Sequence, residues 1–287
     1  MKETKNTNKN DRFFYKKSLG QNFLTDEKLL AEIVIKAGVN KDTTVLEIGC
    51  GAGALTAELA KSAKKVIGYE IDGRLIPTLN KIAEEYGNVE IINKDVMKES
   101  LSEIEKRTGK DYLLVANLPY YITTPVIMRF IENSVNIKGM AVMVQEEVAD
   151  RLAAAPKTSD YGAITVAINL RGEAKKILRV GREKFTPVPN VDSAVVKIDI
   201  DKDKFKGEDL FAVRDTVKCG FNNRRKTLLN NIVNYYGIKR EIAENIITGC
   251  GFSPLVRGEE LSAADYVKLT NALKENGYEK DSTGYKK

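Results

Sequence analysis

The tetrapeptide Asn117-Leu118-Pro119-Tyr120 places an amide, a rigid proline and an aromatic ring directly after an apolar run, residues 112–116, that is typical of a buried strand. Open α/β sheets carry out their chemistry at the carboxyl ends of strands, where these side chains would stand. An Asn side chain can hydrogen-bond an amino group, and a Tyr ring can stack on a base. The tetrapeptide therefore indicates a site for a planar, nitrogen-bearing substrate, such as a base turned out of its stack. Taken alone, it could equally be an ordinary turn that ends a strand.

A glycine-rich turn follows another apolar run, over residues 45–48. The segment Glu47-Ile48-Gly49-Cys50-Gly51-Ala52-Gly53 has the spacing G-x-G-x-G, whereas a dinucleotide site has G-x-G-x-x-G. Glycines let the backbone approach a ligand closely. The acidic residue within the strand suits a cationic amino-acid moiety better than a pyrophosphate. For this segment alone, a glycine turn that serves only packing is the alternative.

Two more carboxylates stand at the ends of the next expected strands. Glu70 lies twenty-one residues beyond Gly49, where it could accept hydrogen bonds from a ribose diol. Asp95 follows the run over residues 89–92 and could accept a hydrogen bond from an adenine amino group. Because these features recur in order at successive strand ends, they predict a site for S-adenosylmethionine. Upstream, a loop over residues 20–24 leads to Thr25 or Asp26 as the N-cap of a helix.

The chain contains no histidine, which excludes a His general base and His-ligated metals. Its three cysteines, Cys50, Cys219 and Cys250, are too widely spaced for a closed disulfide framework or a paired zinc motif, so reduced thiols are expected. Any catalysis must rely on carboxylates, amides, backbone groups and aromatic rings.

Apolar, β-rich runs alternate with amphipathic segments along the first two thirds of the chain. Strands are expected over residues 45–48, 66–69, 89–92, 112–116 and 140–144, with helical spacing around residues 29–34, 55–60 and 126–130. This alternation predicts an α/β fold with a mostly parallel sheet and helices on both faces. Residues 163–170 and 193–200 are expected to add an antiparallel, hairpin-like pair of strands at one edge.

With 287 residues and 43% hydrophobic content, the chain can form one large and one smaller domain. We expect an α/β domain over residues 13–200, a helical domain over 205–275, a disordered basic tail over 1–12 and a loose tail over 276–287. No apolar stretch approaches the roughly 18 to 20 residues that span a bilayer, and the lysine- and asparagine-rich start has no apolar signal segment. A cytoplasmic location is therefore expected.

The net charge of +6 is a moderate basic excess that is compatible with a polyanion partner. The excess is concentrated in the segment that ends at Lys16 and Lys17 and in the cluster Arg224-Arg225-Lys226. Two separated clusters could bind phosphates from two sides. The alternative is a solubilising tail together with one solvated helix end.

Taken together, the motifs resemble the bacterial small-subunit ribosomal RNA adenine N6,N6-dimethyltransferases over residues 14–274. The resemblance rests on the segments Leu19-Gly20-Gln21-Asn22-Phe23-Leu24, Glu47 to Gly53, Asn117 to Ile122, Gln145 to Leu152, Phe185 to Ser193 and Phe221 to Leu228. Asn190, where a lysine is common in the family, is a minor departure.

The resemblance implies a seven-stranded Rossmann-like methyltransferase sheet, a small all-helical C-terminal domain and S-adenosyl-L-methionine as cofactor. It implies cofactor contacts at Asn22, Leu24, Gly49, Glu70, Asp95 and Asn117, and Gly51 of the same turn is expected to join them. The implied substrate is a pair of adjacent adenosines in a loop near the 3′ end of 16S rRNA, each methylated twice within the immature 30S subunit. A monomer is the default expectation.

An exocyclic adenine amine is a poor nucleophile because its lone pair is delocalised into the ring. If the Asn117 side-chain oxygen and the Leu118 carbonyl accept the two amino hydrogens, the lone pair can point at the sulfonium methyl. Tyr120 would stack on one face of the flipped adenine and Phe185 on the other. Phe185 could instead be a core aromatic that anchors its loop.

Two other functions are considered. A 23S rRNA adenine methylase of the macrolide-resistance type would share fold and chemistry, and Leu118 together with the segments 145–152 and 185–193 favours the small-subunit enzyme. A non-catalytic assembly factor would keep the fold as a scaffold, which the intact Asn117, Glu70 and Asp95 disfavour. The segment 157–162 is expected to be a mobile loop near the mouth of the site.

Overall fold

The computed structural model describes residues 22–278. The predictions for Lys16 and Lys17, for the basic tail over residues 1–12 and for the last nine residues of the chain lie outside this range.

Strands and helices alternate from the start of the described chain. The order is α1 (Glu27–Ala37), β2 (Thr44–Ile48), α2 (Ala54–Ser62), β3 (Lys65–Tyr69), α3 (Ile76–Tyr86), β4 (Val89–Ile92), α4 (Leu101–Thr108), β5 (Tyr112–Asn117), α5 (Thr123–Asn133) and β6 (Ile137–Gln145). These bounds confirm the five strands expected from the apolar runs. Asp26 is the N-cap of α1, because its side chain accepts a hydrogen bond from the Leu29 amide.

One seven-stranded sheet has the order β4-β3-β2-β5-β6-β9-β7, which confirms the expected α/β class. The first five strands are parallel, whereas β9 (Ser193–Ile200) runs antiparallel to both β6 and β7 (Gly172–Val180). After β2 the chain adds β3 and β4 on one side of the sheet, and after β5 it adds β6 on the other side. The strand order therefore reverses between β2 and β5. Such a reversal is where open α/β sheets bind their ligands.

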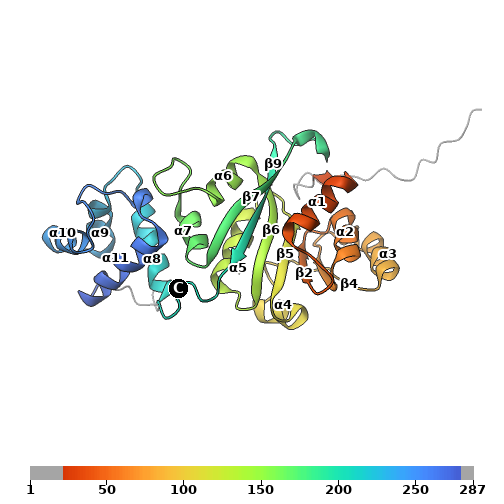
Figure 1. Cartoon of the computed structure of the whole chain (residues 1–287), viewed down its shortest axis with the longest axis horizontal. Helices are drawn as coiled ribbons and strands as arrows, with labels where there is room; N and C mark the ends of the chain where they lie inside the picture. Colours follow the sequence, from red (N-terminus) through yellow and green to blue (C-terminus); the bar gives the residue numbers. More distant parts are fainter. Residues whose placement is uncertain (1–21, 279–287) are drawn as a thin grey trace, which may run out of the picture.

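Helices cover both faces of the sheet (Figure 1). One core contains Ile104 of α4 and Phe130 of α5, and the other contains Ile33 of α1 and Leu59 of α2. The central strands are thus buried on both sides, which explains why they are nearly continuous apolar runs in the sequence.

The prediction of a strand over residues 163–170 was wrong. Residues Ala163–Asn169 form helix α7, and the strand that pairs with β9 is β7. Helix α7 is short and β-branched, but Thr165 bonds to the Arg151 carbonyl and Val166 and Ile168 are fully buried. Tertiary packing has overridden local propensity here. Strand β7 gave no strong apolar pattern because it is an exposed edge strand rich in lysine and arginine.

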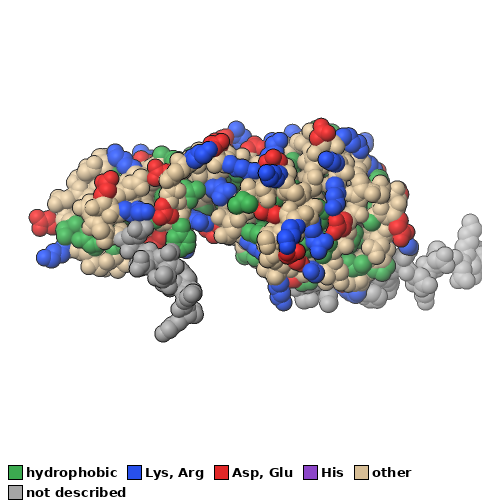
Figure 2. All heavy atoms as spheres, turned by 90° about the horizontal axis from the view of Figure 1, so that it is seen from below, with side chains coloured by type: hydrophobic (Ala, Val, Ile, Leu, Met, Phe, Trp, Pro, Cys, Tyr) green, Lys and Arg blue, Asp and Glu red, His purple; other side chains and the backbone are tan. Residues whose placement is uncertain are grey.

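Four helices form the other end of the elongated molecule (Figure 1). They are α8 (Leu210–Phe221), α9 (Leu228–Tyr236), α10 (Arg240–Gly249) and α11 (Ala263–Glu275). Helix α6 (Glu146–Leu152) and two short 3₁₀ turns, Arg182–Lys184 and Gly258–Glu260, complete the helical elements of residues 22–278. Figure 2 shows that the molecule narrows between the two ends and that basic side chains on this face lie among acidic ones.

The segment 157–162 is held by the helical end of the molecule, which contradicts the expected mobile loop at the mouth of the site. Tyr161 is fully buried, and its hydroxyl donates to the Leu261 carbonyl at 3.0 Å. The Lys157 amide donates to the Glu259 carbonyl at 3.0 Å. Tyr161, Val166 and Leu170 belong to the same apolar core as α8 to α11.

Within residues 22–278, no helix is both long and apolar enough to cross a membrane.

Gly172 begins β7 at a point of close approach to β9, where a Cβ atom would clash with the Asp199 carbonyl oxygen. We expect Gly172→Ala to lower the free energy of unfolding by about 2 kcal/mol, because overpacking forces a backbone shift. Chemical denaturation measures the change. Gly249→Ala is the matched control, since no atom lies within 4 Å of its added Cβ and it should be neutral or slightly stabilising. Equal stability of the two variants would contradict the proposed clash.

Candidate active site

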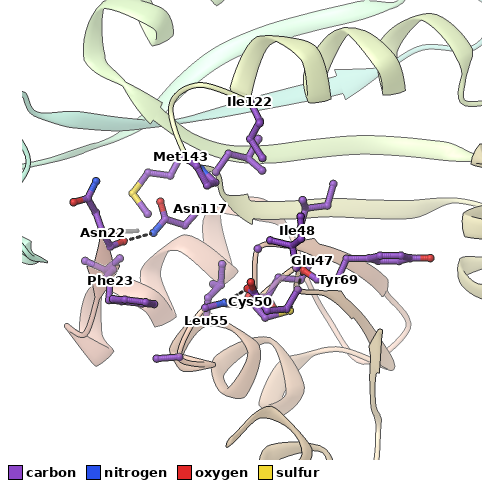
Figure 3. A pocket seen from close by; sticks show the side chains of 18 of the residues that line it. Asn22, Phe23, Glu47, Ile48, Cys50, Leu55, Tyr69, Asn117, Ile122 and Met143 are labelled. Carbon is purple, nitrogen blue, oxygen red and sulfur yellow. Dashed lines mark hydrogen bonds between the residues drawn. The ribbon is translucent and has the colours of Figure 1, made fainter. Parts of the chain in front are cut away.

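A cavity of about 260 Å³ opens at the carboxyl edge of the sheet (Figure 3). Its walls come from the ends of β2, β3, β5 and β6, the segment after β4, and the small sheet of β1 (Phe23–Leu24) and β8 (Phe185–Thr186). The residues predicted for cofactor and base all line this cavity: Asn22, Leu24, Gly49, Gly51, Glu70, Asp95, Asn117, Leu118, Pro119, Tyr120 and Phe185. Residues as far apart in sequence as Asn22 and Phe185 are thus brought to one site.

The glycine turn after β2 requires glycine for two different reasons. Gly49 and Gly51 line the cavity with φ of 76° and 57°, a region that side chains rarely adopt. A Cβ atom at Gly51 would come within 2.9 Å of the Phe23 ring, which closes over the turn. Gly53 does not line the cavity, and a Cβ there would clash with Ile82 of α3. Gly53 therefore serves close packing, which was the alternative interpretation of this turn, whereas Gly49 and Gly51 form part of the cavity wall.

The Glu70 carboxylate fixes the shape of this turn. Its Oε2 accepts from the Gly51 amide and its Oε1 accepts from the Asp72 amide, both at 2.8 Å. The Asn93 side chain in turn donates to the Glu70 carbonyl at 2.7 Å. Glu70 is only 5% exposed, and each carboxylate oxygen keeps a second lone pair for a further donor.

Asp95 lies on the wall beyond Glu70. Its Oδ1 accepts from the Met97 amide at 2.9 Å, which holds the carboxylate at the start of the segment after β4. Ile71, Val96 and Met97 also line this part of the cavity, so the two acidic groups are accompanied by apolar surface that suits a flat ring.

Asn117 is oriented by a hydrogen bond across the site. Its Nδ2 donates to the Asn22 carbonyl at 3.2 Å, so the side-chain oxygen points the other way (Figure 3). The amide is thereby left with its acceptor available and one of its two donor hydrogens engaged. Met143 of β6 pairs in register with Asn117 and lines the cavity beside it.

Tyr120 is held at its hydroxyl end. The hydroxyl lies 3.0 Å from Ser193 Oγ, and Ser193 is fully buried at the start of β9. The backbone around it is a turn in which the Ile122 amide donates to the Pro119 carbonyl at 3.1 Å. The ring is therefore anchored at its far end by a strand distant in sequence.

Phe185 borders the cavity from the other side but is 2% exposed. It packs in the core with Leu24, its register partner in β1, and with Val180. Its position is that of a core aromatic that also lines the cavity. Stacking of its ring on a substrate stays a prediction.

Glu47 is a buried carboxylate behind the glycine turn. It is 1% exposed, it lines the cavity, and its Oε2 has no hydrogen-bond partner. Burial, with the nearby Glu70 charge as a smaller contribution, raises the pKa of Glu47 to about 7. A buried acceptor without a partner at a cavity wall is suited to a cationic donor.

The predicted RNA-binding cluster is distant from this cavity and divides into two parts. Arg225 and Lys226 are exposed in the turn before α9. Arg224 instead donates to the Ser159 carbonyl at 3.0 Å and the Tyr161 carbonyl at 2.9 Å. All three residues are exposed, so RNA binding by the cluster stays a prediction, while the Arg224 guanidinium also joins the turn before α9 to the segment 157–162.

Sequence reasoning missed several lining residues, among them Phe23, Ile71, Tyr121 and Met143. Met143 and Ile71 could have been found, since each stands at the carboxyl end of an expected strand. Phe23 and Tyr121 adjoin predicted residues in the motifs, but nothing local indicates that their side chains reach the cavity.

Comparisons with known proteins agree in the kind of protein they identify. A profile of the ribosomal RNA adenine dimethylase family matches residues 12–275. Ribosomal RNA small subunit methyltransferase A of Geobacillus thermodenitrificans (strain NG80-2) is 46% identical to this chain, covering 91% of it and 92% of the relative. The protein of the same name from Bacillus thuringiensis (strain Al Hakam) is 43% identical with the same coverage.

Two crystal structures are similar over nearly the whole chain. A dimethyladenosine transferase from Plasmodium falciparum has a TM-score of 0.75 at 28% identity, covering 90% of this chain and 99% of that one. The 23S rRNA methyltransferase ErmE has a TM-score of 0.69 at 27% identity, covering 88% of this chain and 100% of that one.

The raised pKa of Glu47 predicts a pH dependence of stability. The folded protein keeps a proton up to about pH 7, whereas the unfolded chain releases it near the ordinary value of 4.5. This contribution is fully present below pH 4.5 and is lost as the pH rises through about 7. Glu47→Gln removes it, so the stability of the variant relative to wild type should rise by about 3 kcal/mol over this range. Urea unfolding across the range tests this, with the exposed Glu84→Gln as control; a constant difference for Glu47→Gln would contradict it.

Proposed function

The chain belongs to the ribosomal RNA adenine dimethylase family, and on this basis we propose that it methylates N6 of two adjacent adenosines near the 3′ end of 16S rRNA, giving N6,N6-dimethyladenosine during assembly of the 30S subunit. The observation that carries the proposal is the orientation of Asn117. Its amide is held so that an acceptor faces the cavity, next to an anchored tyrosine ring.

The residues around the glycine turn fit S-adenosyl-L-methionine. This cofactor supplies an electrophilic methyl group on a sulfonium. Glu70, with lone pairs left beyond its two backbone donors, would bind the ribose diol, and Asp95 would accept from the adenine amino group. A Cβ at Gly49 would meet the nearest atoms of other segments only at 3.9 Å, which leaves room for a ligand there, and the unpartnered Oε2 of Glu47 supports the presence of a cationic group nearby. Asn22 and Leu24 complete the wall.

Asn117 and Leu118 would prepare the substrate nitrogen. With the Asn117 oxygen and the Leu118 carbonyl as acceptors of the two amino hydrogens, the lone pair of the amine is released from the ring and aimed along one direction. The Asn22 carbonyl helps by accepting from one of the two Asn117 donor hydrogens, which opposes a rotation that would turn the amide nitrogen towards the substrate. Positioning of this kind lowers the activation barrier of methyl transfer without any proton transfer to the protein.

The proton released after methylation has no histidine to receive it. A methylated amino nitrogen that carries a positive charge is acidic, so its proton can leave to water. The monomethylated amine then offers one hydrogen fewer, and Asn117 or Leu118 alone would position it.

Tyr120 would hold the flipped base by stacking. The Ser193 hydroxyl fixes the far end of the ring, so the ring loses little freedom when the base arrives. Stacking contributes roughly 1–3 kcal/mol per base, which offsets much of the cost of extruding it. Phe185 would close the second face.

Methyl transfer from labelled S-adenosylmethionine tests the proposal directly. Undermethylated 30S subunits and protein-free 23S rRNA are offered in parallel, and the modified nucleoside is identified by mass. Dimethyladenosine confined to the 3′ end of 16S rRNA supports the proposal. Because the ErmE structure is also similar, label in 23S rRNA alone would favour that activity, and no label in either would favour a non-catalytic assembly factor.

Asn117→Ala removes the proposed acceptor. We expect methyl transfer to fall by about a thousand-fold, since the amine loses its orienting partner, while affinity for S-adenosylmethionine falls by less than about ten-fold. Single-turnover kinetics and calorimetry measure the two effects. Asn133→Ala makes the same chemical change on α5 away from the cavity and should behave as wild type. Retained transfer in Asn117→Ala would refute the role.

The two parts of the basic cluster should respond differently. Arg225→Ala and Lys226→Ala should each weaken binding to 30S subunits and reduce the salt dependence of log K by about one. Arg224→Ala should mainly lower the melting temperature, because it releases the carbonyls of Ser159 and Tyr161. Binding titrations at several salt concentrations and thermal unfolding separate the two effects. A changed salt slope with unchanged melting for Arg224→Ala would assign it to RNA instead.

A further inference from the structure

Tyr121 lies at the mouth of the cavity, and the mechanism proposed above assigns no role to its side chain. It lines the cavity, yet 62% of the residue is exposed. Its neighbour Tyr120 is partly buried and bonded to Ser193 through its hydroxyl. Two consecutive tyrosines therefore face different surroundings, one inside the site and one at its rim.

Exposed apolar side chains also occur in the loop before β9, which the Tyr120 hydroxyl contacts at Ser193. Val188 and Val191 are 60% and 43% exposed in the loop that leads from β8 to Ser193. The Tyr120–Ser193 hydrogen bond ties this loop to the turn that carries Tyr121. Exposed apolar surface of this kind suits the faces of bases, whereas phosphates are bound by Lys, Arg and backbone amides.

We propose that Tyr121 is a stacking platform for the nucleotide that adjoins the adenosine held by Tyr120. The proposal rests on the function proposed above, since it requires an RNA substrate. Consecutive Cα atoms are 3.8 Å apart, so the two side chains start from adjacent points of the chain, one directed into the site and the other to its rim. When one base is turned out, its neighbour loses a stacking partner, and the Tyr121 ring would take that place.

This arrangement also suits a substrate with two adjacent target adenosines. The other target adenosine lies on the 3′ side of the flipped base in one round and on its 5′ side in the other, so Tyr121 would stack on it in the round in which it lies on the side of that ring. Tyr121 would therefore determine specificity for the base beside the target without touching the reacting nitrogen.

The test combines a change in the protein with a change in the RNA. Methyl transfer is measured on 30S subunits reconstituted with unmethylated 16S rRNA, and on subunits in which one of the two adenosines is replaced by an abasic ribose. Wild type, Tyr121→Ala and Tyr121→Phe are compared on both substrates. Phe211→Ala, which removes another exposed aromatic that does not line the cavity, is the matched control.

On the intact substrate, Tyr121→Ala should lose about ten-fold in kcat/KM, which corresponds to the lower half of the range for one stacked base. On the abasic substrate it should equal wild type, because the partner of the ring is missing. Tyr121→Phe and Phe211→Ala should match wild type on both. Affinity for S-adenosylmethionine, measured by calorimetry, should be unchanged in every variant.

Two results would overturn the inference while leaving the proposed function intact: Tyr121→Ala as fast as wild type on the intact substrate, or an equal loss on both substrates. If wild type fails to methylate 16S rRNA in the intact subunit, the proposed function fails and the inference fails with it.

Discussion

The parallel pairing of β2 with β5 is the constraint on which the site depends. Glu47 of β2 lies opposite Val115 of β5, so both strands end at the same edge of the sheet. The glycine turn and Asn117 are thereby brought together although some seventy residues of chain separate them. Since the connections of β2 and β5 lead away in opposite directions, a space remains between them.

The walls of this space differ in chemistry from one side to the other. The β3 and β4 side presents carboxylates whose oxygens are already aligned by backbone amides, whereas the β5 and β6 side presents an amide, a methionine and a tyrosine. Fixed acceptors suit the hydroxyl and amino groups of a nucleoside, and the neutral side suits a reaction at a weakly basic nitrogen. A chain without histidine can therefore support methyl transfer by positioning alone.

The sequence indicated the central strands and the lining residues at their ends because both depend on local patterns: buried parallel strands are continuous apolar runs, and polar residues at their ends face one edge. Asn22, Leu24 and Phe185 were expected only from the resemblance to a known family, since they lie outside these strands. The sequence misassigned residues 163–170, since a β-branched heptapeptide folds as a helix when it is packed between others. Strand β7 was overlooked because an edge strand carries lysines. The contacts of Arg224 and the position of Tyr121 depend on tertiary neighbours that no local pattern encodes.

The burial of Tyr161, Val166 and Leu170 in the core of the C-terminal helices has a consequence for how this protein could be divided or recombined. If the chain were divided between β9 and α8, the C-terminal helices would lose three residues that fill their core. They would also lose the two carbonyls that accept hydrogen bonds from Arg224. The helical part is thus not a transferable module. An exchange of the helical end between relatives would have to carry residues 154–170 along with the helices, because these residues complete its core.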